Sequence, residues 1–267
     1  MSAIPQTTSN EPPLLRSDAG GVVTLTLNRP TQFNSLSIEL IGLLQAELER
    51  IGKDPQARVV VIAGAGKAFC AGHDLKEMRS DESKAFQKAL FERCGRMMQT
   101  ITAIPQPVIA RVHGIATAAG CQLVAACDLA VASENAKFAV SGVNLGLFCS
   151  TPSVALSRNM GRKQAMEMLL TGEFIDARAA LERGLVNRVV PLEQLDAELK
   201  KLADSILAKT PVAIGIGKRL FYEQLEKGLE GAYTLANEAM ACNMVTEDAK
   251  EGIDAFVGKR KPEWKGR

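Results

Sequence analysis

Residues 108–132 read VIARVHGIATAAGCQLVAACDLAVA, the most apolar long stretch of the chain. An apolar run at Val108–Val112 opens it, small residues fill its middle, and a second apolar run at Leu129–Ala132 closes it. Arg111 and two glycines interrupt the stretch, which argues against a membrane-spanning helix. We therefore predict a buried strand, a loop rich in Gly and Ala, a short helix around residues 120–126, and a second strand.

The same alternation of strand and helix precedes this stretch. Val22–Leu27 reads VVTLTL, and its alternating polar residues are typical of a strand. Ser37 is expected to cap a helix whose apolar residues recur at helical spacing as far as Ile51. The run Val59–Ala63 indicates a fully buried strand, and another helix is expected over about residues 82–102. Strands that alternate with helices predict an α/β fold with right-handed crossovers.

The pattern changes from Ser153 onward, where helical spacing dominates and Val189–Val190 is the remaining strand signal. The expected helices are Leu192–Ala208, Pro211–Leu225, Leu229–Met244 and Glu247–Phe256. These helices carry more apolar positions than one helical face needs, which predicts association with further subunits. The expected regions are a flexible N-terminal tail over residues 1–18 without an export signal, an α/β core over residues 19–191, and a helical C-terminal region over residues 192–267.

Composition excludes several classes of protein. The chain has 32 Lys and Arg against 30 Asp and Glu, and the net charge of +2 argues against a nucleic-acid-binding polycation. Aromatic residues make up only 4%, too few for a platform on which single-stranded nucleic acid stacks. The six cysteines include no C-x-x-C pair, and with two histidines they offer no zinc-finger spacing. We therefore expect no metal site, reduced thiols and a cytoplasmic location.

Two segments place small residues where a strand is followed by a helix. They are Ala68–Leu75, which reads AFCAGHDL, and His113–Leu123, which reads HGIATAAGCQL. Small side chains let a ligand approach the backbone N–H groups and the positive end of a helix. Together the segments are a candidate oxyanion hole. The residues alone leave a second interpretation open, in which the small side chains only permit close packing.

From about Val22 to Lys265 the chain resembles the crotonase superfamily, also called the enoyl-CoA hydratase/isomerase family. The resemblance rests on the order and spacing of these motifs: LNRP, AFCAGHDLK, PVIARVHGIATAAG, CDLAVA, KFAVSGVNLG, EMLLTG, GLVNRVV and FVGKRKP. Within that family, ATAAGCQL and GLFCSTP resemble the enoyl-CoA hydratase domain-containing protein 3 type. The resemblance implies a crotonase-like spiral of ββα turns and a helical trimerisation region. It also implies an acyl-CoA thioester as substrate, with no cofactor besides that coenzyme A, and a homotrimer or hexamer.

The resemblance also implies which groups act on the substrate. The backbone N–H groups of His73 and Ala119 would form the oxyanion hole. The family's hydratases carry carboxylates at the positions of Gln122 and Gly142, and its isomerases carry an acid at the position of Ser150. Syn hydration needs one group that takes a proton from water and another that delivers a proton to carbon, and an amide and a glycine do neither. Efficient hydration is therefore not expected.

Further contacts with the substrate are implied by the matched positions. They are Asn28, Arg29, Asn34, Ala71, Asp74, Leu75, Lys76, Gly120, Cys149, Phe256, Lys259 and Lys261. Gln122 is a candidate for orienting a water molecule, with Asn144 also near the reacting carbons. Cys149 is expected to form a small apolar wall, and His73 and His113 are expected to have structural side chains.

Three functions stay open. The first is the nominal family activity, an enoyl-CoA hydratase or isomerase. The second is another enolate-stabilising enzyme such as a decarboxylase, since loss of CO₂ needs no base and the segments AGHD and VNLG resemble methylmalonyl-CoA decarboxylases. The third is a non-catalytic acyl-CoA binder that kept the pocket and lost the acids.

Overall fold

The structure is a computed structural model that describes residues 11–267. Within these residues, six strands form one sheet in the order β1-β2-β3-β5-β7-β10, and four form a second sheet in the order β4-β6-β8-β9. The strands are β1 (Leu14–Ala19), β2 (Val22–Leu27), β3 (Val59–Gly64), β4 (Ala68–Cys70), β5 (Val108–Val112), β6 (Ile115–Thr117), β7 (Leu129–Ser133), β8 (Lys137–Ala139), β9 (Ile175–Asp176) and β10 (Arg188–Val190).

Three successive turns of the chain follow one pattern. Each gives a strand to the six-stranded sheet, bends sharply, gives a short strand to the four-stranded sheet and continues into a helix: β3 leads to β4, β5 to β6, and β7 to β8. The longer strands pair in parallel, with Val61 opposite Ile109. Gly114 lets successive turns stack closely, because a Cβ there would lie 2.5 Å from the carbonyl oxygen of Lys67. The expected α/β spiral of ββα turns is confirmed.

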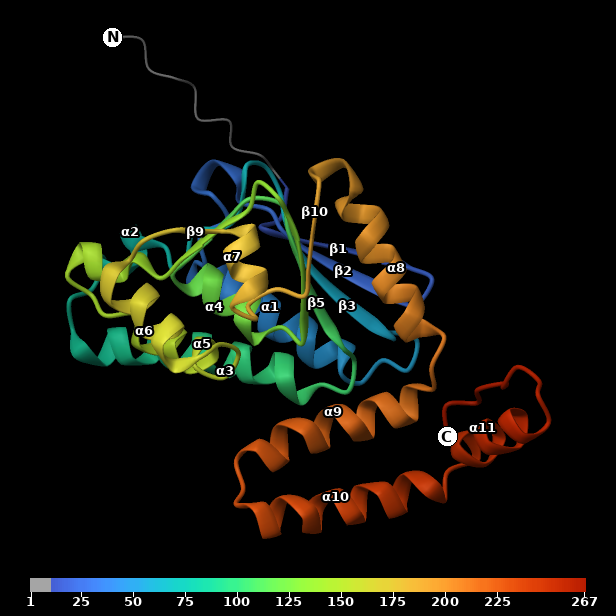
Figure 1. Cartoon of the computed structure of the whole chain (residues 1–267). Helices are drawn as coiled ribbons and strands as arrows, with labels where there is room; N and C mark the ends of the chain where they lie inside the picture. Colours follow the sequence, from blue (N-terminus) through green and yellow to red (C-terminus); the bar gives the residue numbers. More distant parts are fainter. Residues whose placement is uncertain (1–10) are drawn as a thin grey trace.

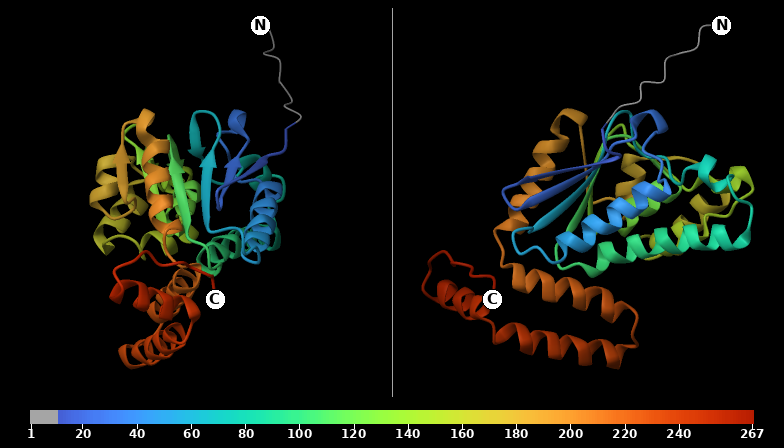
Figure 2. Two further views of the ribbon diagram at one scale, coloured as in Figure 1. Left: turned by 90° about the vertical axis from the view of Figure 1, so that its right-hand side faces the viewer. Right: turned by 180° about the vertical axis from the view of Figure 1, so that it is seen from behind.

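Helices cover both faces of the larger sheet (Figures 1 and 2). The α-helices are α1 (Ile38–Ile51), α2 (Leu75–Met78), α3 (Lys84–Ala103), α4 (Ala119–Ala126), α5 (Ser150–Leu156), α6 (Arg162–Thr171), α7 (Ala177–Glu182), α8 (Leu195–Leu207), α9 (Pro211–Leu225), α10 (Leu229–Met244) and α11 (Glu247–Val257). The 3₁₀ helices are η1 (Pro30–Gln32), η2 (Ser141–Leu145) and η3 (Leu192–Gln194). Among the helices of residues 11–267, none is both long and apolar enough to cross a membrane.

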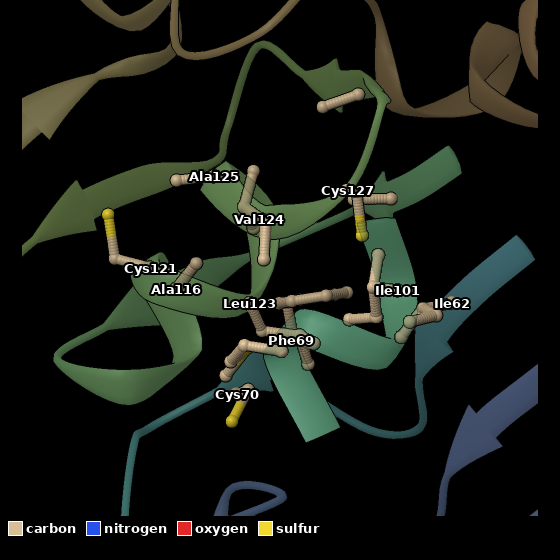
Figure 3. Packing of buried hydrophobic residues seen from close by; sticks show 14 of the residues in the cluster. Ile62, Phe69, Cys70, Ile101, Ala116, Cys121, Leu123, Val124, Ala125 and Cys127 are labelled. Atoms are coloured by element: carbon tan, nitrogen blue, oxygen red, sulfur yellow. The ribbon is translucent and has the colours of Figure 1, made fainter. Parts of the chain in front are cut away.

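The hydrophobic core follows from the two-residue period of the strands. Val60 and Ile62 of β3 face the main core, which also contains the buried sides of α1 and α3, whereas Val59 faces a smaller cluster with Leu195 and Leu202 of α8. Figure 3 shows part of the main core, where residues from β3, β4, α3 and α4 pack together around Phe69. This packing fixes α4, and with it the start of that helix, against the second sheet.

The N-terminal region differs from the expected flexible tail of residues 1–18. Leu14–Ala19 forms β1, which pairs antiparallel with β2 in a register that places Leu14 opposite Leu27. Gly20 and Gly21 close this hairpin, and their φ angles of 57° and 83° are ones that glycine adopts readily. Residues 1–10 of the expected tail lie outside the described residues.

The C-terminal region also divides differently from the expected helical extension over residues 192–267. α8 packs on the larger sheet and belongs to the core, because its apolar face completes the smaller hydrophobic cluster. Only α9, α10 and α11 extend from the core as an arm (Figures 1 and 2). The expected bounds of α9 and α10 are confirmed to the residue.

Candidate active site

Two corners of the spiral bring His73 and Ala119 close together. His73 follows β4, and Ala119 follows β6, and these two strands are parallel neighbours in the second sheet. Their carboxyl ends therefore lie at the same edge. A Cβ placed on Gly72 would lie 2.9 Å from the Cβ of Ala118 and 3.2 Å from the backbone nitrogen of Ala119. The two corners are thus in contact through their backbones, which only glycine at position 72 permits.

The backbone of His73 is oriented by a single bridge to Leu36. The Leu36 N–H donates to the Gly72 carbonyl oxygen at 2.7 Å, and the Asp74 N–H donates to the Leu36 carbonyl oxygen at 3.1 Å. Because the pairing is parallel, its two hydrogen bonds use the carbonyl group of Gly72 and the N–H group of Asp74, the residues on either side of His73. The N–H of His73 itself is therefore directed away from Leu36.

The N–H of Ala119 lies at the start of α4, directly after a residue with strained backbone geometry. Ala119 is the first residue of α4, and N–H groups in the first turn of a helix have no acceptor within the helix. The preceding residue, Ala118, has φ 51° and ψ −119°, a conformation that costs a non-glycine residue about 1–3 kcal/mol. Hydrogen bonds hold it there: its N–H donates to the Ala139 carbonyl oxygen at 2.9 Å, and its carbonyl oxygen accepts from Gln122 N–H at 3.0 Å.

Gly120 allows α4 to start this close to β4. A Cβ at position 120 would lie 2.1 Å from the carbonyl oxygen of Cys70, so any larger residue would push the helix away. The sequence indicated the importance of these glycines but gave no sign of the roles of Leu36 and Ala118. Neither residue has reactive side-chain chemistry, and both act only through backbone geometry.

The two histidines have well-defined surroundings. The ring of His73 packs edge-on against Phe91, with ring centres 5.3 Å apart, and burial lowers the pKa of its imidazole to about 4. His73 is therefore neutral at pH 7. His113 Nε2 lies 2.9 Å from the Gly66 carbonyl oxygen, and burial is the main cause that lowers the pKa of this ring too. Both environments favour the neutral form of the ring.

The three positions where the family's acids are expected carry Gln122, Gly142 and Ser150. Gln122 lies within α4 and is 4% exposed, and its Oε1 has no hydrogen-bond partner among residues 11–267. Gly142 lies in η2, and Ser150 is the first residue of α5. A buried amide oxygen without a partner normally has an explanation in a ligand or in water.

Cys149 occupies the space beside Gly142. The Gly142 N–H donates to Cys149 Sγ at 3.3 Å, and a Cβ on residue 142 would lie 2.7 Å from that sulfur and 2.6 Å from the Leu147 carbonyl oxygen. Burial raises the pKa of the Cys149 thiol, so the sulfur is uncharged at neutral pH. The loop between residues 142 and 149 folds back on itself, and this folding, which no sequence motif indicated, fills the space where a side chain of residue 142 would begin.

Two side chains that were expected to contact the substrate form hydrogen bonds within the protein. Asn34 is fully buried; its Nδ2 donates to the carbonyl oxygens of Ala65 and Ala68 at 2.8 Å each, and its Oδ1 accepts from Arg29 N–H at 2.9 Å. Asn28 Nδ2 donates to the Pro12 carbonyl oxygen at 3.1 Å. These amides hold neighbouring loops together, a role that the motif alone did not reveal.

Six of the other expected contacts lie in two separate parts of the chain. Ala71, Leu75 and Lys76 lie in the corner that carries His73, and Leu75 is 53% exposed. The second group, at the end of α11, comprises Phe256, Lys259 and Lys261. Figure 1 shows α11 on the arm, far from α2 and α4. Within one chain, the structure does not bring the second group to His73 and Ala119.

Comparison with known proteins agrees with the motifs. Residues 17–267 match the family model described as Enoyl-CoA hydratase/isomerase. The chain is 46% identical over 244 residues to enoyl-CoA hydratase domain-containing protein 3, mitochondrial, of Xenopus laevis. The aligned residues cover 91% of this chain and 83% of that protein.

Solved structures give the same result. A crystal structure of an enoyl-CoA hydratase from Mycobacterium smegmatis is similar with a TM-score of 0.94 and 57% identity, over 95% of this chain and 99% of that one. The crystal structure of human enoyl-CoA hydratase domain-containing protein 3 is similar with a TM-score of 0.92 and 43% identity, over 95% of this chain and 100% of that one. The resemblance that the motifs indicated is confirmed.

Proposed function

The chain belongs to the enoyl-CoA hydratase/isomerase family, and we propose that it polarises the carbonyl of an acyl-CoA thioester with the backbone N–H groups of His73 and Ala119. The observation that carries the proposal is the contact between the two corners, where a Cβ on Gly72 would lie only 3.2 Å from the nitrogen of Ala119. Donors fixed in this way stabilise the charge that develops on the thioester oxygen, typically by about 3 to 4 kcal/mol for each donor.

We propose further that hydration is not the main reaction. Gln122 and Gly142 carry no carboxylate, and each lost proton-transfer group removes about 10²- to 10⁴-fold in rate. An enolate-forming reaction without a base fits this site better. In a decarboxylation, the bond between the α-carbon and the carboxylate breaks, its electron pair forms the enolate on the thioester oxygen, CO₂ leaves, and water protonates the α-carbon.

The coenzyme A part of the substrate is proposed to bind along the corner that carries Lys76. Lys259 and Lys261 follow α11, the last helix of the arm, so they would reach the phosphates of a substrate held by a neighbouring subunit. Cations near anionic phosphates strengthen binding in a salt-dependent way. We propose no cofactor beyond the coenzyme A of the substrate.

The proposed compartment is one that keeps thiols reduced, as the cytoplasm does. All six cysteines are free thiols, and five of them are buried. The Xenopus laevis relative is named as a mitochondrial protein. A mitochondrial matrix and a cytoplasm are alike in keeping such thiols reduced, so the free cysteines fit either location.

A panel of thioesters, followed by mass spectrometry, tests the proposed reaction. The panel contains crotonyl-CoA, a longer enoyl-CoA, malonyl-CoA and methylmalonyl-CoA. We expect CO₂ loss from a carboxylated thioester, and crotonyl-CoA hydration at least about a thousandfold slower than in a hydratase with both glutamates. Hydration at the rate of such an enzyme would contradict the proposal.

The second candidate function is a non-catalytic acyl-CoA binder. The same absence of acids at positions 122 and 142 favours it. The panel distinguishes the two, because a binder shows saturable affinity for the thioesters by calorimetry and forms no product from any of them.

A further inference from the structure

The segment that carries His73 is fastened by an ion pair between Arg29 and Asp74. Arg29 Nη2 lies 2.9 Å from Asp74 Oδ2, and the two side chains are only 19% and 13% exposed. Arg29 Nη1 donates to the Ser35 carbonyl oxygen at 2.6 Å. The pair therefore joins the turn after β2 to the corner after β4, which are more than forty residues apart in the sequence.

Asp74 holds the residues on both sides of itself. Its Oδ1 accepts the Lys76 N–H at 3.0 Å and caps the first turn of α2, while its own N–H donates to the Leu36 carbonyl oxygen. His73 lies directly between Asp74 and Gly72. Glycine at φ 93° has wide conformational freedom, so the peptide that contains the His73 N–H depends on these outside contacts for its orientation.

The backbone of Arg29 is fixed by two hydrogen bonds to Asn34. Its backbone N–H donates to Asn34 Oδ1 at 2.9 Å, and its carbonyl oxygen accepts the Asn34 N–H at 2.9 Å. Because the backbone of Arg29 is held by Asn34 and its guanidinium bonds to both Ser35 and Asp74, the side chain has little conformational freedom and links the two segments rigidly.

The ion pair also has an electrostatic consequence. Asp74 is the residue after His73, and an uncompensated carboxylate so near would oppose the negative charge that develops on a bound thioester oxygen. The guanidinium of Arg29 neutralises that carboxylate in a largely buried setting, where screening by solvent is weak.

We propose that Arg29 is a positioning residue for the thioester site: through Asp74 it fixes the direction of the His73 N–H and cancels the charge beside it, without touching the substrate. This inference rests on the proposed function of the His73 and Ala119 N–H groups. It replaces the expectation that Arg29 and Asp74 contact coenzyme A through their side chains.

The test measures the polarisation of a bound carbonyl directly. Butanoyl-CoA labelled with ¹³C at its carbonyl has no double bond to hydrate, and difference infrared spectroscopy reports the stretching frequency of its carbonyl when it is bound. We expect the wild-type protein to shift this frequency to lower wavenumber than in solution. In Arg29→Met we expect less than about half of that shift, because the donor is no longer held in place, whereas the Kd for free coenzyme A changes by less than about threefold.

Three variants complete the experiment. Arg29→Lys keeps a cation without the planar fork, and is expected to restore part of the shift. Asp74→Asn keeps a good helix cap but has one carbonyl oxygen for two donors, so it loosens the segment while it removes the carboxylate charge, and it is expected to lose less of the shift than Arg29→Met. Arg111→Met is the control, because it breaks the ion pair between Arg111 of β5 and Asp196 of α8, a helix that Figure 1 shows away from α2 and α4. Circular dichroism and thermal unfolding identify the variants that are folded, and the comparison uses those.

The outcomes separate the inference from the proposed function. If bound butanoyl-CoA shows no shift in the wild-type protein, the proposed oxyanion hole is wrong. If the wild-type shift is present and survives undiminished in folded Arg29→Met, the positioning role is overturned and the oxyanion hole stands. Loss of more than about half of the shift in Arg29→Met, with a smaller loss in Asp74→Asn and the shift intact in Arg111→Met, supports the role.

Discussion

The sulfur of Cys149 lies where a side chain of residue 142 would begin. Replacement of Gly142 by Glu therefore forces atoms into filled space, and it meets the Leu147 backbone as well as the thiol. We expect Gly142→Glu to lower the free energy of unfolding by about 1 to 3 kcal/mol, as overpacking does, and to give no increase in crotonyl-CoA hydration. Urea denaturation and a hydration assay measure the two effects.

Gln122→Glu is the matched control for this prediction, because glutamate has nearly the shape of glutamine at a position already built for it. Its buried carboxyl costs some stability through desolvation but requires no movement of the backbone. A Gly142→Glu variant as stable as the wild-type protein would show that the loop at residues 142–149 opens easily, contrary to the packing described above.

The second prediction at this scale concerns pH. Burial lowers the pKa of His73 to about 4, whereas a histidine in the unfolded chain titrates near about 6.5. Between these values the unfolded chain binds a proton that the folded chain does not. The free energy of unfolding should therefore be highest above about pH 6.5 and fall by up to about 3 kcal/mol as the pH is lowered to about 4.

Urea unfolding between pH 7.5 and about 4 measures this dependence. The chain has two histidines, and burial lowers the pKa of His113 as well, so His113 contributes with the same sign. His73→Gln should flatten the curve and leave the smaller part due to His113. The paired carboxylates, such as Asp74, lose their stabilising contribution at lower pH, because their pKa values lie below the ordinary range for Asp. A curve unchanged by His73→Gln would contradict the prediction.

At the scale of elements, a buried ion pair fastens α9 to the core. Lys218 Nζ of α9 donates to Asp128 Oδ2 at 2.6 Å and to the carbonyl oxygens of Ile101 and Gln106 at 2.8 Å each, and its side chain is 7% exposed. Tyr222, one turn further along α9, donates its hydroxyl to Asp128 Oδ1 at 2.8 Å. The Asp128 carboxylate thus holds α9, the first helix of the arm, against the core.

Lys218→Met should lower the free energy of unfolding by about 3 to 5 kcal/mol, since it leaves the Asp128 carboxylate buried without its cation. The control is Lys200→Met, which removes an exposed pair with Asp204 on α8 and should cost less than about 0.5 kcal/mol. Denaturant unfolding of both variants gives the comparison. Equal and small effects would mean that Tyr222 and backbone donors suffice to hold α9.

At the scale of the whole molecule, the arm leaves a large apolar surface uncovered. Its exposed apolar residues are Phe221, Leu225, Leu229, Tyr233, Met240, Met244, Val245, Ile253, Phe256 and Val257. Leu229 is 77% exposed and Phe256 is 85% exposed. Many exposed apolar side chains on three successive helices are typical of a subunit interface.

We therefore expect a trimer, or a hexamer of two trimers, that buries this surface. Light scattering at micromolar concentration should give a mass that is a multiple of three times 28.6 kDa. Leu229→Lys with Phe256→Glu should weaken the assembly, whereas Leu75→Lys, on the core, should not. A stable monomer at this concentration would rule out the assembly. It would also remove the proposed contact between coenzyme A and lysines of a neighbouring subunit.

The sequence by itself determined the class of fold, the course of the longer helices and strands, and the presence of an amide and a glycine, with no carboxylate, at positions 122 and 142. These features depend on local periodicity and on caps such as Ser37, which neighbouring residues decide. Strands of two or three residues, such as β8 and β9, carry too little periodicity to be predicted.

Only the tertiary structure decided where β1 pairs, that α8 belongs to the core, and how the site is built. Three features decide how that site is built: the contact between the corners at Gly72 and Ala119, the ion pair between Arg29 and Asp74, and the thiol of Cys149 beside residue 142. The first two join residues tens of positions apart, and the third depends on how a loop folds back. Such contacts follow from strand register and close packing, which local sequence preference does not encode.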